Sequence, residues 1–192
     1  MQTSCYVTFR GCRNRISLGS HICCSGDPVF TSQRAIDFLA EGLSSGKRCL
    51  LVGPDEFATR LIPYAQRKKI NIPAAVQNGD IGRISGAHDG TALLGEVVQY
   101  IEGYPGDVTL ILGKLGWELP GWPLIDDLLA YEVLVDVAAS SFAAIWLCIH
   151  HSGTDPSRVL QTHSRLLLHD RIVPNPSHRV AQGFLEELRS SQ

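Results

Sequence analysis

Short, uninterrupted apolar runs that alternate with amphipathic segments constrain the fold of this chain more than any other feature. The runs lie in residues 48–52 (RCLLV), 108–112 (VTLIL) and 143–149 (AAIWLCI). Runs of this length are typical of strands that are covered on both faces in a parallel sheet. A shorter candidate strand, His21 to Ser25, precedes them and leads into a turn at Gly26, Asp27 and Pro28.

The segments between these runs carry apolar residues at helical spacing, as Ile36, Leu39 and Leu43 do. We expect helices from Thr31, from Asp55, over 94–101, over 123–139, from Asp155 to His163 and over 180–188. Pro63 should kink or restart the second of these, and residues 71–90 should be mostly loop around a short strand at 81–84. Residues 166–168 and 171–173 could form a closing strand pair. This alternation predicts an α/β sandwich with a mainly parallel sheet.

Length and charge narrow the class of protein further. The 192 residues suit one domain, residues 20–192, preceded by an N-terminal arm or weak edge strand in residues 1–19. A net charge of −2 offers no basic face for nucleic acid. No window is apolar enough for a membrane span, and the first twenty residues lack the apolar core of a signal peptide. The six cysteines form no CxxC pair. We therefore expect reduced thiols and a cytoplasmic location, with no direct contact to nucleic acid or membrane.

The first turn lies where a phosphate-binding loop would begin, but its residues differ from the GxxxxGK[ST] pattern. Gly26 keeps the first glycine, whereas Thr31, Ser32 and Gln33 stand where glycine, lysine and a hydroxyl residue belong. The strand at 108–112 ends in Gly113 and Lys114 rather than in an acidic residue. We therefore expect the backbone scaffold of a nucleotide-binding site without the lysine, hydroxyl and acidic residues that such a site needs.

Ligands of parallel α/β sheets bind beyond the carboxyl ends of the strands. Four loops meet this condition: Asp27 to Phe30, Pro54 to Glu56, Gly113 to Trp122, and His150 to Asp155. Glu56 could act as a base, or it could be a first-turn charge on its helix. Trp117 and Trp122 either plug the top of the core or line a pocket for an apolar ligand.

Several histidines and a cysteine invite a metal interpretation, because imidazole and thiolate bind zinc and copper. These residues are His21, Cys148, His150, His151 and His163. Their spacing matches no tight ligand pattern, so we expect satisfied core residues, no metal and no cofactor. A nucleophilic cysteine would need an orienting third residue that the sequence does not identify. No catalytic residue is therefore assigned.

A family resemblance is carried by several stretches in order. They are ISLGSHICC at 16–24, FLAEGLSSGKRCLLV at 38–52, GW at 116–117, LLAYE at 128–132, Cys148, THS at 162–164 and Asn175-Pro176. With these stretches the chain resembles the MEDS domain, the sensory module named for methanogens, methylotrophs and the DcmR regulator. The resemblance carries over to His21, Trp117, Glu132, Cys148 and His163. It departs at Cys24, Ser25 and Gly26, at Lys114, where the family usually has glutamate, and at His150, where it has an aromatic residue.

The resemblance implies a RecA/KaiC-like three-layer sandwich with a mainly parallel central sheet and a degenerate phosphate loop. It further implies a non-catalytic role in signal transduction or transcription control, with small organic molecules such as hydrocarbon derivatives as stimuli. The chain would pass its signal on through a regulatory protein partner or through a homo-oligomer. The alternatives are a KaiC-like ATPase with an aberrant loop and a purely structural interaction module. The expected ligand-binding residues are His21, Asp27, Phe30, Glu56, Trp117, Trp122, Cys148, His150 and His163.

Overall fold

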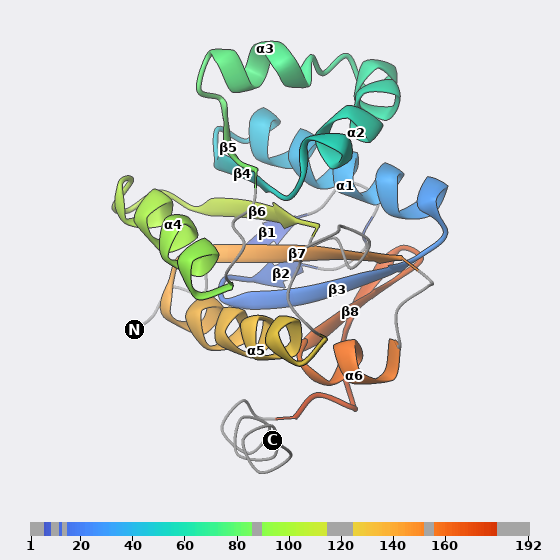
Figure 1. The fold of residues 1–192 in the computed structure, drawn as a ribbon. Helices are drawn as coiled ribbons and strands as arrows, with labels where there is room; N and C mark the ends of the chain where they lie inside the picture. The colour runs from blue at the N-terminus through green and yellow to red at the C-terminus, as the bar shows by residue number, and fades with distance from the viewer. Residues whose placement is uncertain are drawn as a thin grey trace.

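A seven-stranded sheet forms the centre of the protein in a computed structural model, which describes residues 6–8, 12, 15–85, 90–114, 125–151 and 156–179. The strand order is β5-β4-β6-β7-β3-β8-β9, and only the β8–β9 pair is antiparallel (Figure 1). The strands are β3 (Ser20–Gly26), β4 (Arg48–Val52), β5 (Ile81–Ile84), β6 (Thr109–Gly113), β7 (Ala144–His151), β8 (Arg165–Leu168) and β9 (Arg171–Pro174). The predicted α/β class with a mainly parallel sheet is confirmed.

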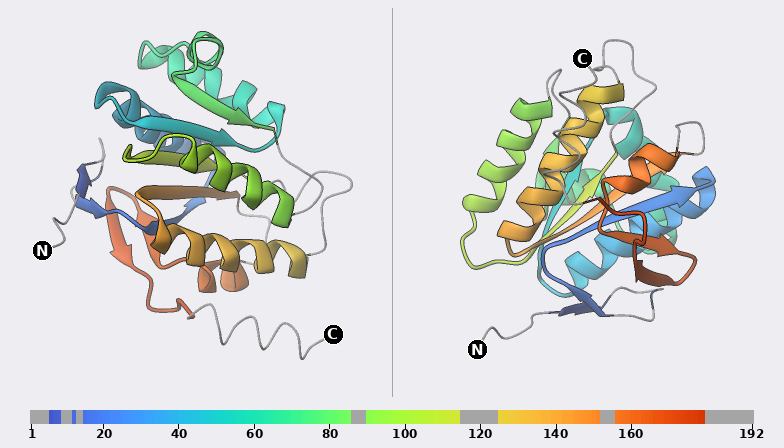
Figure 2. Two further views of the ribbon diagram at one scale, coloured as in Figure 1. Left: turned by 90° about the vertical axis from the view of Figure 1, so that its left-hand side faces the viewer. Right: turned by 90° about the horizontal axis from the view of Figure 1, so that it is seen from below.

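Helices cover both faces of this sheet, so the protein has three layers (Figures 1 and 2). The helices α1 (Pro28–Ser44), α2 (Asp55–Arg67) and α3 (Ile72–Gln77) lie on one side, whereas α4 (Gly90–Glu102) and α5 (Ile125–Ser141) lie on the other. The short helix α6 (Pro156–Gln161) precedes β8. None of the helices within the described residues is long and apolar enough to span a membrane.

The alternation of side chains along β3 separates two buried environments. Ile22 and Cys24 belong to the apolar core on the α1 side of the sheet. His21 and Cys23 point to the opposite side, where α5 packs. Trp146 of β7 faces that same side, within a core formed with α4 and α5. Polar residues of β3 therefore enter the core on the α5 side.

The start of the chain forms a second, small sheet. In it, β1 (Tyr6–Thr8) pairs with β2 (Arg15–Ser17) in antiparallel orientation, separate from the main sheet. Ile16 is buried in the core on the α1 side. The segment expected as an arm is thus attached to the domain by at least this side chain.

One expectation about local structure is wrong, and a second is wrong in part. Residues 72–77, expected as loop, form α3, because the Asn71 side chain caps it by accepting the Ala74 N–H at 3.1 Å. α2 does not restart at Pro63 but runs through it as one helix, and the buried side chains Leu61 and Ala65 hold its two halves against the core. The helix expected over 180–188 lies outside the described residues.

Candidate functional site: a buried histidine, cysteine and carboxylate cluster

Four parts of the chain bring ionisable side chains together between the sheet and α5. The parallel pairing of β3 with β7 places Cys23 beside Cys148. Glu132 projects from α5 toward these strands, and His163 reaches the same place from the turn between α6 and β8. The cluster comprises His21, Cys23, Glu132, Asp136, Cys148, His150 and His163.

His21 is the centre of this cluster. Its Nε2 atom lies 3.2 Å from Glu132 Oε2 and 3.4 Å from Cys148 Sγ. Its ring stacks on that of His163, with 3.9 Å between the ring centroids. Neither histidine has exposed surface, so these contacts form without competing bulk water.

The ring of His163 is fixed by the backbone. Its Nδ1 atom lies 2.9 Å from the Val159 carbonyl oxygen, which can only accept a hydrogen bond. The proton therefore sits on Nδ1, and the lone pair of Nε2 faces the cluster. That Nε2 atom is 3.4 Å from His150 Nε2 and 3.5 Å from Glu132 Oε2.

Charge is distributed unevenly over the cluster. Burial lowers the pKa of His21, but its contacts with Asp136 and Glu132 outweigh burial and raise that pKa above its usual value. Burial raises the pKa of Asp136, but His21 and His178 outweigh it and lower that pKa. The His178 Nε2 atom lies 2.9 Å from Asp136 Oδ2. At this end of the cluster, Asp136 therefore lies between His178 and His21, and the Asp136–His21 contact favours the charged form of both groups.

The other end of the cluster is neutral. Burial, followed by the charges of His21 and His150, lowers the pKa of His163 well below its usual value. Burial and the neighbouring Glu132 carboxylate raise the pKa of the Cys148 thiol well above its usual value. Both groups therefore remain uncharged at neutral pH.

Several polar atoms of this region are buried without a hydrogen bond. Both Glu132 carboxylate oxygens lie near histidine nitrogens, yet neither makes a hydrogen bond of acceptable geometry within the described residues. The indole N–H of Trp146 is likewise buried and without an acceptor among them. Unsatisfied polar atoms of this kind cost free energy and mark places where a ligand can supply the missing partner.

Donor atoms of four cluster residues are close enough to hold a metal ion. One ligand atom each from His21, Glu132, Cys148 and His163 lies within 4.8 Å of the others. Cys23 and His150 form a second such set that shares His163. The arrangement can therefore bind a cation or a small polar ligand.

The predicted site residues fall into three groups. His21, Cys148, His150 and His163 lie together in the cluster. Asp27, Phe30 and Glu56 lie elsewhere: Asp27 caps α1, Phe30 contacts Arg34 and His169, and Glu56 is exposed in the first turn of α2. Trp117 and Trp122 lie outside the described residues.

Sequence reasoning missed Asp136 and Cys23 as site residues, and it reached Glu132 only through the family resemblance. A signal existed, because Glu132 and Asp136 are four residues apart in a mostly apolar stretch of their helix and therefore share one face. Cys23 is two residues after His21 on a strand, which places both on the same face of the sheet.

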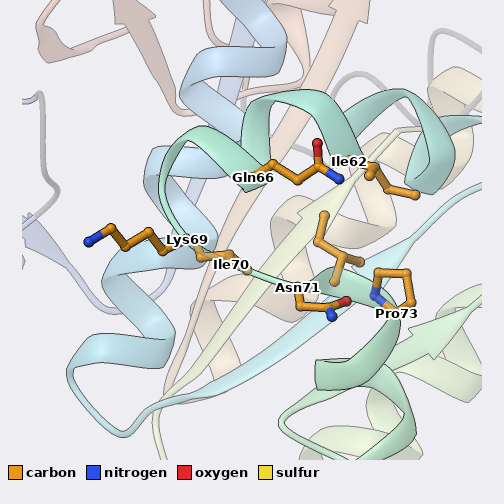
Figure 3. Close-up of a pocket in the computed structure, with 7 residues that line it drawn as sticks. Ile62, Gln66, Lys69, Ile70, Asn71 and Pro73 are labelled. Carbon is orange, nitrogen blue, oxygen red and sulfur yellow. The ribbon is translucent and has the colours of Figure 1, made fainter.

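Surface grooves lie on the other face of the sheet, among α1, α2 and α3. The groove between α2 and α3 has a volume of about 330 Å³ (Figure 3). It is lined by Ile62, Gln66, Lys69, Ile70, Asn71, Ile72 and Pro73. A second, between α1 and α2, has a volume of about 220 Å³ and includes Arg34 and Asp37. Neither includes a cluster residue.

The layers and the buried cluster define a three-layer α/β domain with a concentrated ionisable site on one face of its sheet. The family described as MEDS, the MEthanogen/methylotroph, DcmR Sensory domain, matches residues 20–166. The chain therefore belongs to the MEDS family. A search of curated proteins finds no significant match. The matched range includes β3, α5 and β7 with His163, and thus every residue of the cluster.

Proposed function

We propose that this chain is a cytoplasmic, non-catalytic sensory domain of signal transduction or transcription control. It binds a small organic ligand at the buried cluster and passes the signal to a regulatory protein or to a second copy of itself. The observation that carries this proposal is the collection of ionisable groups inside the core of a domain from a sensory family. Buried groups of this kind cost stability unless they are paired, so a function is the best reason for their presence.

Access to the cluster is easier beside β7 than beside β3. Cys148 and His150 of β7 keep 8% and 4% of their surface exposed, whereas His21 and His163 keep none. A small ligand that enters beside β7 meets Cys148 and His150 before the fully buried His21 and His163. The apolar side chain of Trp146 faces the same side of the sheet and offers its indole N–H deeper in. This combination suits a small organic molecule with one polar group.

The start of α1 supports the loss of phosphate binding. Asp27 Oδ1 accepts the backbone N–H groups of Val29 and Phe30, each at 2.9 Å. A phosphate would need these same N–H groups and would meet the negative charge of Asp27. With no lysine at position 32, the loop favours a degenerate phosphate site over a KaiC-like ATPase.

Thermal melting of the purified chain tests the proposal. The compounds are short-chain alcohols, amines, carboxylic acids and halogenated hydrocarbons, with Mg²⁺–ATP in a parallel series. At a concentration 100 times Kd, a ligand stabilises the fold by about 2.7 kcal/mol, which raises Tm by about 5–10 °C. We expect such a rise with at least one organic compound and none with Mg²⁺–ATP. A rise with Mg²⁺–ATP together with its hydrolysis would instead establish the ATPase.

A pair of variants locates the ligand. His150→Ala alters the accessible end of the cluster and should remove the ligand-induced rise in Tm. Gln66→Ala alters the groove between α2 and α3 (Figure 3) and should leave that rise unchanged. The opposite pattern would place the ligand in the groove and refute the assignment to the cluster.

A further inference from the structure

Three of the six distances among four donor atoms of the cluster are close to those of a tetrahedral metal site. Bonds of about 2.0–2.3 Å from a zinc ion to nitrogen, oxygen and sulfur ligands put those ligand atoms about 3.3–3.8 Å apart. His21 Nε2 is 3.4 Å from Cys148 Sγ and 3.2 Å from Glu132 Oε2. His163 Nε2 is 3.5 Å from the same Glu132 oxygen. All four donor atoms lie within 4.8 Å of one another.

We propose that His21, Glu132, Cys148 and His163 bind one divalent transition-metal ion, with Zn²⁺ as the best fit. Two imidazoles, a thiolate and a carboxylate form a mixed N, S and O set that zinc accepts and that magnesium and calcium do not favour. This site does not depend on the proposed organic ligand, and its test uses none.

The surroundings of His163 match those of a metal-binding histidine. Such a ring gives its second N–H to a carboxylate or a backbone carbonyl, which points the other nitrogen at the metal. His163 donates from Nδ1 to the Val159 carbonyl oxygen at 2.9 Å. The Nδ1 atom of His21 lies 3.4 Å from Asp136 Oδ1, an ion-pair contact that does not have hydrogen-bond geometry. The backbone therefore orients the Nε2 atom of His163 toward the cluster, and the Asp136 carboxylate lies beside the second nitrogen of His21.

Charge also favours a cation at this point. The Glu132 side chain is 1% exposed, and although His21 Nε2 lies 3.2 Å from its Oε2, neither carboxylate oxygen makes a hydrogen bond of acceptable geometry within the described residues. The lone pair of His163 Nε2 faces one of these oxygens, which places two electron-rich atoms 3.5 Å apart. A cation bound between these two atoms would attract both of them and so remove the repulsion.

Binding of the ion changes the protonation of Cys148. The buried thiol is neutral, and it coordinates as thiolate, so its S–H bond breaks as the metal–sulfur bond forms. The proton leaves to solvent, and metal affinity rises with pH as a result. The imidazoles coordinate as neutral rings, so a protonated His21 also gives up its proton on binding.

The rival explanation is a site that contains no metal, in which a protonated His21 alone balances Glu132 and Asp136. Cobalt distinguishes the two, because Co²⁺ takes zinc sites and its absorption reports geometry and sulfur ligation. The chain is unfolded in the presence of a chelator, refolded without metal, and titrated with Co²⁺ and then with Zn²⁺. We expect one bound metal ion per chain, intense tetrahedral bands in the visible range and a thiolate charge-transfer band.

Two cysteine variants provide the matched comparison. Cys148→Ala should abolish the charge-transfer band, whereas Cys24→Ala should retain it, because Cys24 is also buried on β3 but faces the core on the α1 side. Loss of the band in Cys23→Ala with retention in Cys148→Ala would assign the metal to the second set of donors and overturn our assignment.

The wild-type chain gives an answer even if a variant does not fold. A saturating excess of Zn²⁺, about 1,000 times Kd, should raise its Tm by about 10 °C, and a chelator should reverse the rise. Weak octahedral Co²⁺ bands, or metal removed by simple buffer exchange, would show surface binding only. Either of these results, or no change in Tm with Zn²⁺, would refute the site.

Discussion

The imidazole ring of His21 stacks on that of His163 at 3.9 Å, and the environments of the two rings shift their pKa values in opposite directions. His21 belongs to β3, whereas His163 belongs to the turn that leads to the neighbouring strand β8. The stack therefore joins β3 to the start of β8, which lies next to the sheet edge formed by β9. A ligand that moves either ring would change how β8 and β9 sit on the sheet, which is one route from the site to a partner.

Asn175 should be a stability determinant of this edge. Its Nδ2 group donates to the carbonyl oxygens of His163, at 2.8 Å, and Leu160, while its Oδ1 accepts the Ser177 N–H at 2.9 Å. Asn175→Ala leaves these partly buried groups without partners, so urea denaturation should show a loss of about 2–4 kcal/mol. Asn78→Ala, at the exposed end of α3, should cost less than about 0.5 kcal/mol. Equal stability of the two variants would contradict this role.

Gly53 should be intolerant of any side chain. Its φ of +140° disfavours L residues, and a Cβ there would lie 2.3 Å from the Lys114 carbonyl oxygen. Gly53→Ala should therefore reduce the free energy of unfolding by about 2–4 kcal/mol. Gly95→Ala, on the exposed face of α4 with open space around it, should instead raise that free energy by about 0.5–1 kcal/mol. If chemical denaturation shows that both variants change the free energy of unfolding in the same direction, the requirement for glycine at position 53 is disproved.

Asp27 should stabilise α1 as its N-cap. Asp27→Ala removes the acceptor for two backbone N–H groups and should cost about 1 kcal/mol in the free energy of unfolding. Asp27→Asn keeps a capping oxygen and should be close to wild type. If Asp27→Ala melts at the wild-type temperature, the side chain does not act as a cap in solution.

Three thiols should react slowly in the native protein. Burial raises the pKa of Cys12, Cys24 and Cys49 to about 12, from an unfolded value of 9.0. The fold therefore favours the protonated thiol, and this contribution is complete below pH 9 and lost as the pH rises from 9 toward 12. At pH 8 the thiolate population is roughly a thousand times smaller than in the unfolded chain.

Mass-spectrometric mapping after brief alkylation at pH 8 measures this difference. Cys12 is the informative site, because it is only half-buried and its slow reaction would reflect its raised pKa as well as its limited access. Labelling of native Cys12 as fast as in urea would contradict the expected shift.

The fold could be anticipated because three of its strands, β4, β6 and β7, are continuous apolar runs in the sequence. The structure places β4 and β5 at the predicted residues, and β6 and β7 within one or two residues of them. Helix α3 was missed because six residues carry too little periodicity, and only its Asn71 cap and Pro73 indicate it. The N-terminal sheet depends on pairing between two three-residue segments, which leaves no recognisable pattern.

The candidate site was anticipated only in part. A sequence lists His21, Cys148 and His163 far apart, and their spacing resembles no metal or catalytic motif. The parallel register of β3 with β7 and the return of the chain after α6 bring them together, and both are products of tertiary structure. Sequence reasoning therefore looked to the strand ends, whereas the cluster lies beneath them, between the sheet and α5.

NMR mapping of ligand binding tests most directly whether the buried cluster is the sensory centre. Imidazole resonances and backbone amides are followed as the compound that raises Tm is titrated into the labelled chain. We expect shifts of the His21, His150 and His163 imidazole signals, with the amides of Val29 and Phe30 unchanged. Shifts confined to the start of α1, or to residues 62–73 in the groove between α2 and α3, would contradict the assignment of the ligand to the cluster.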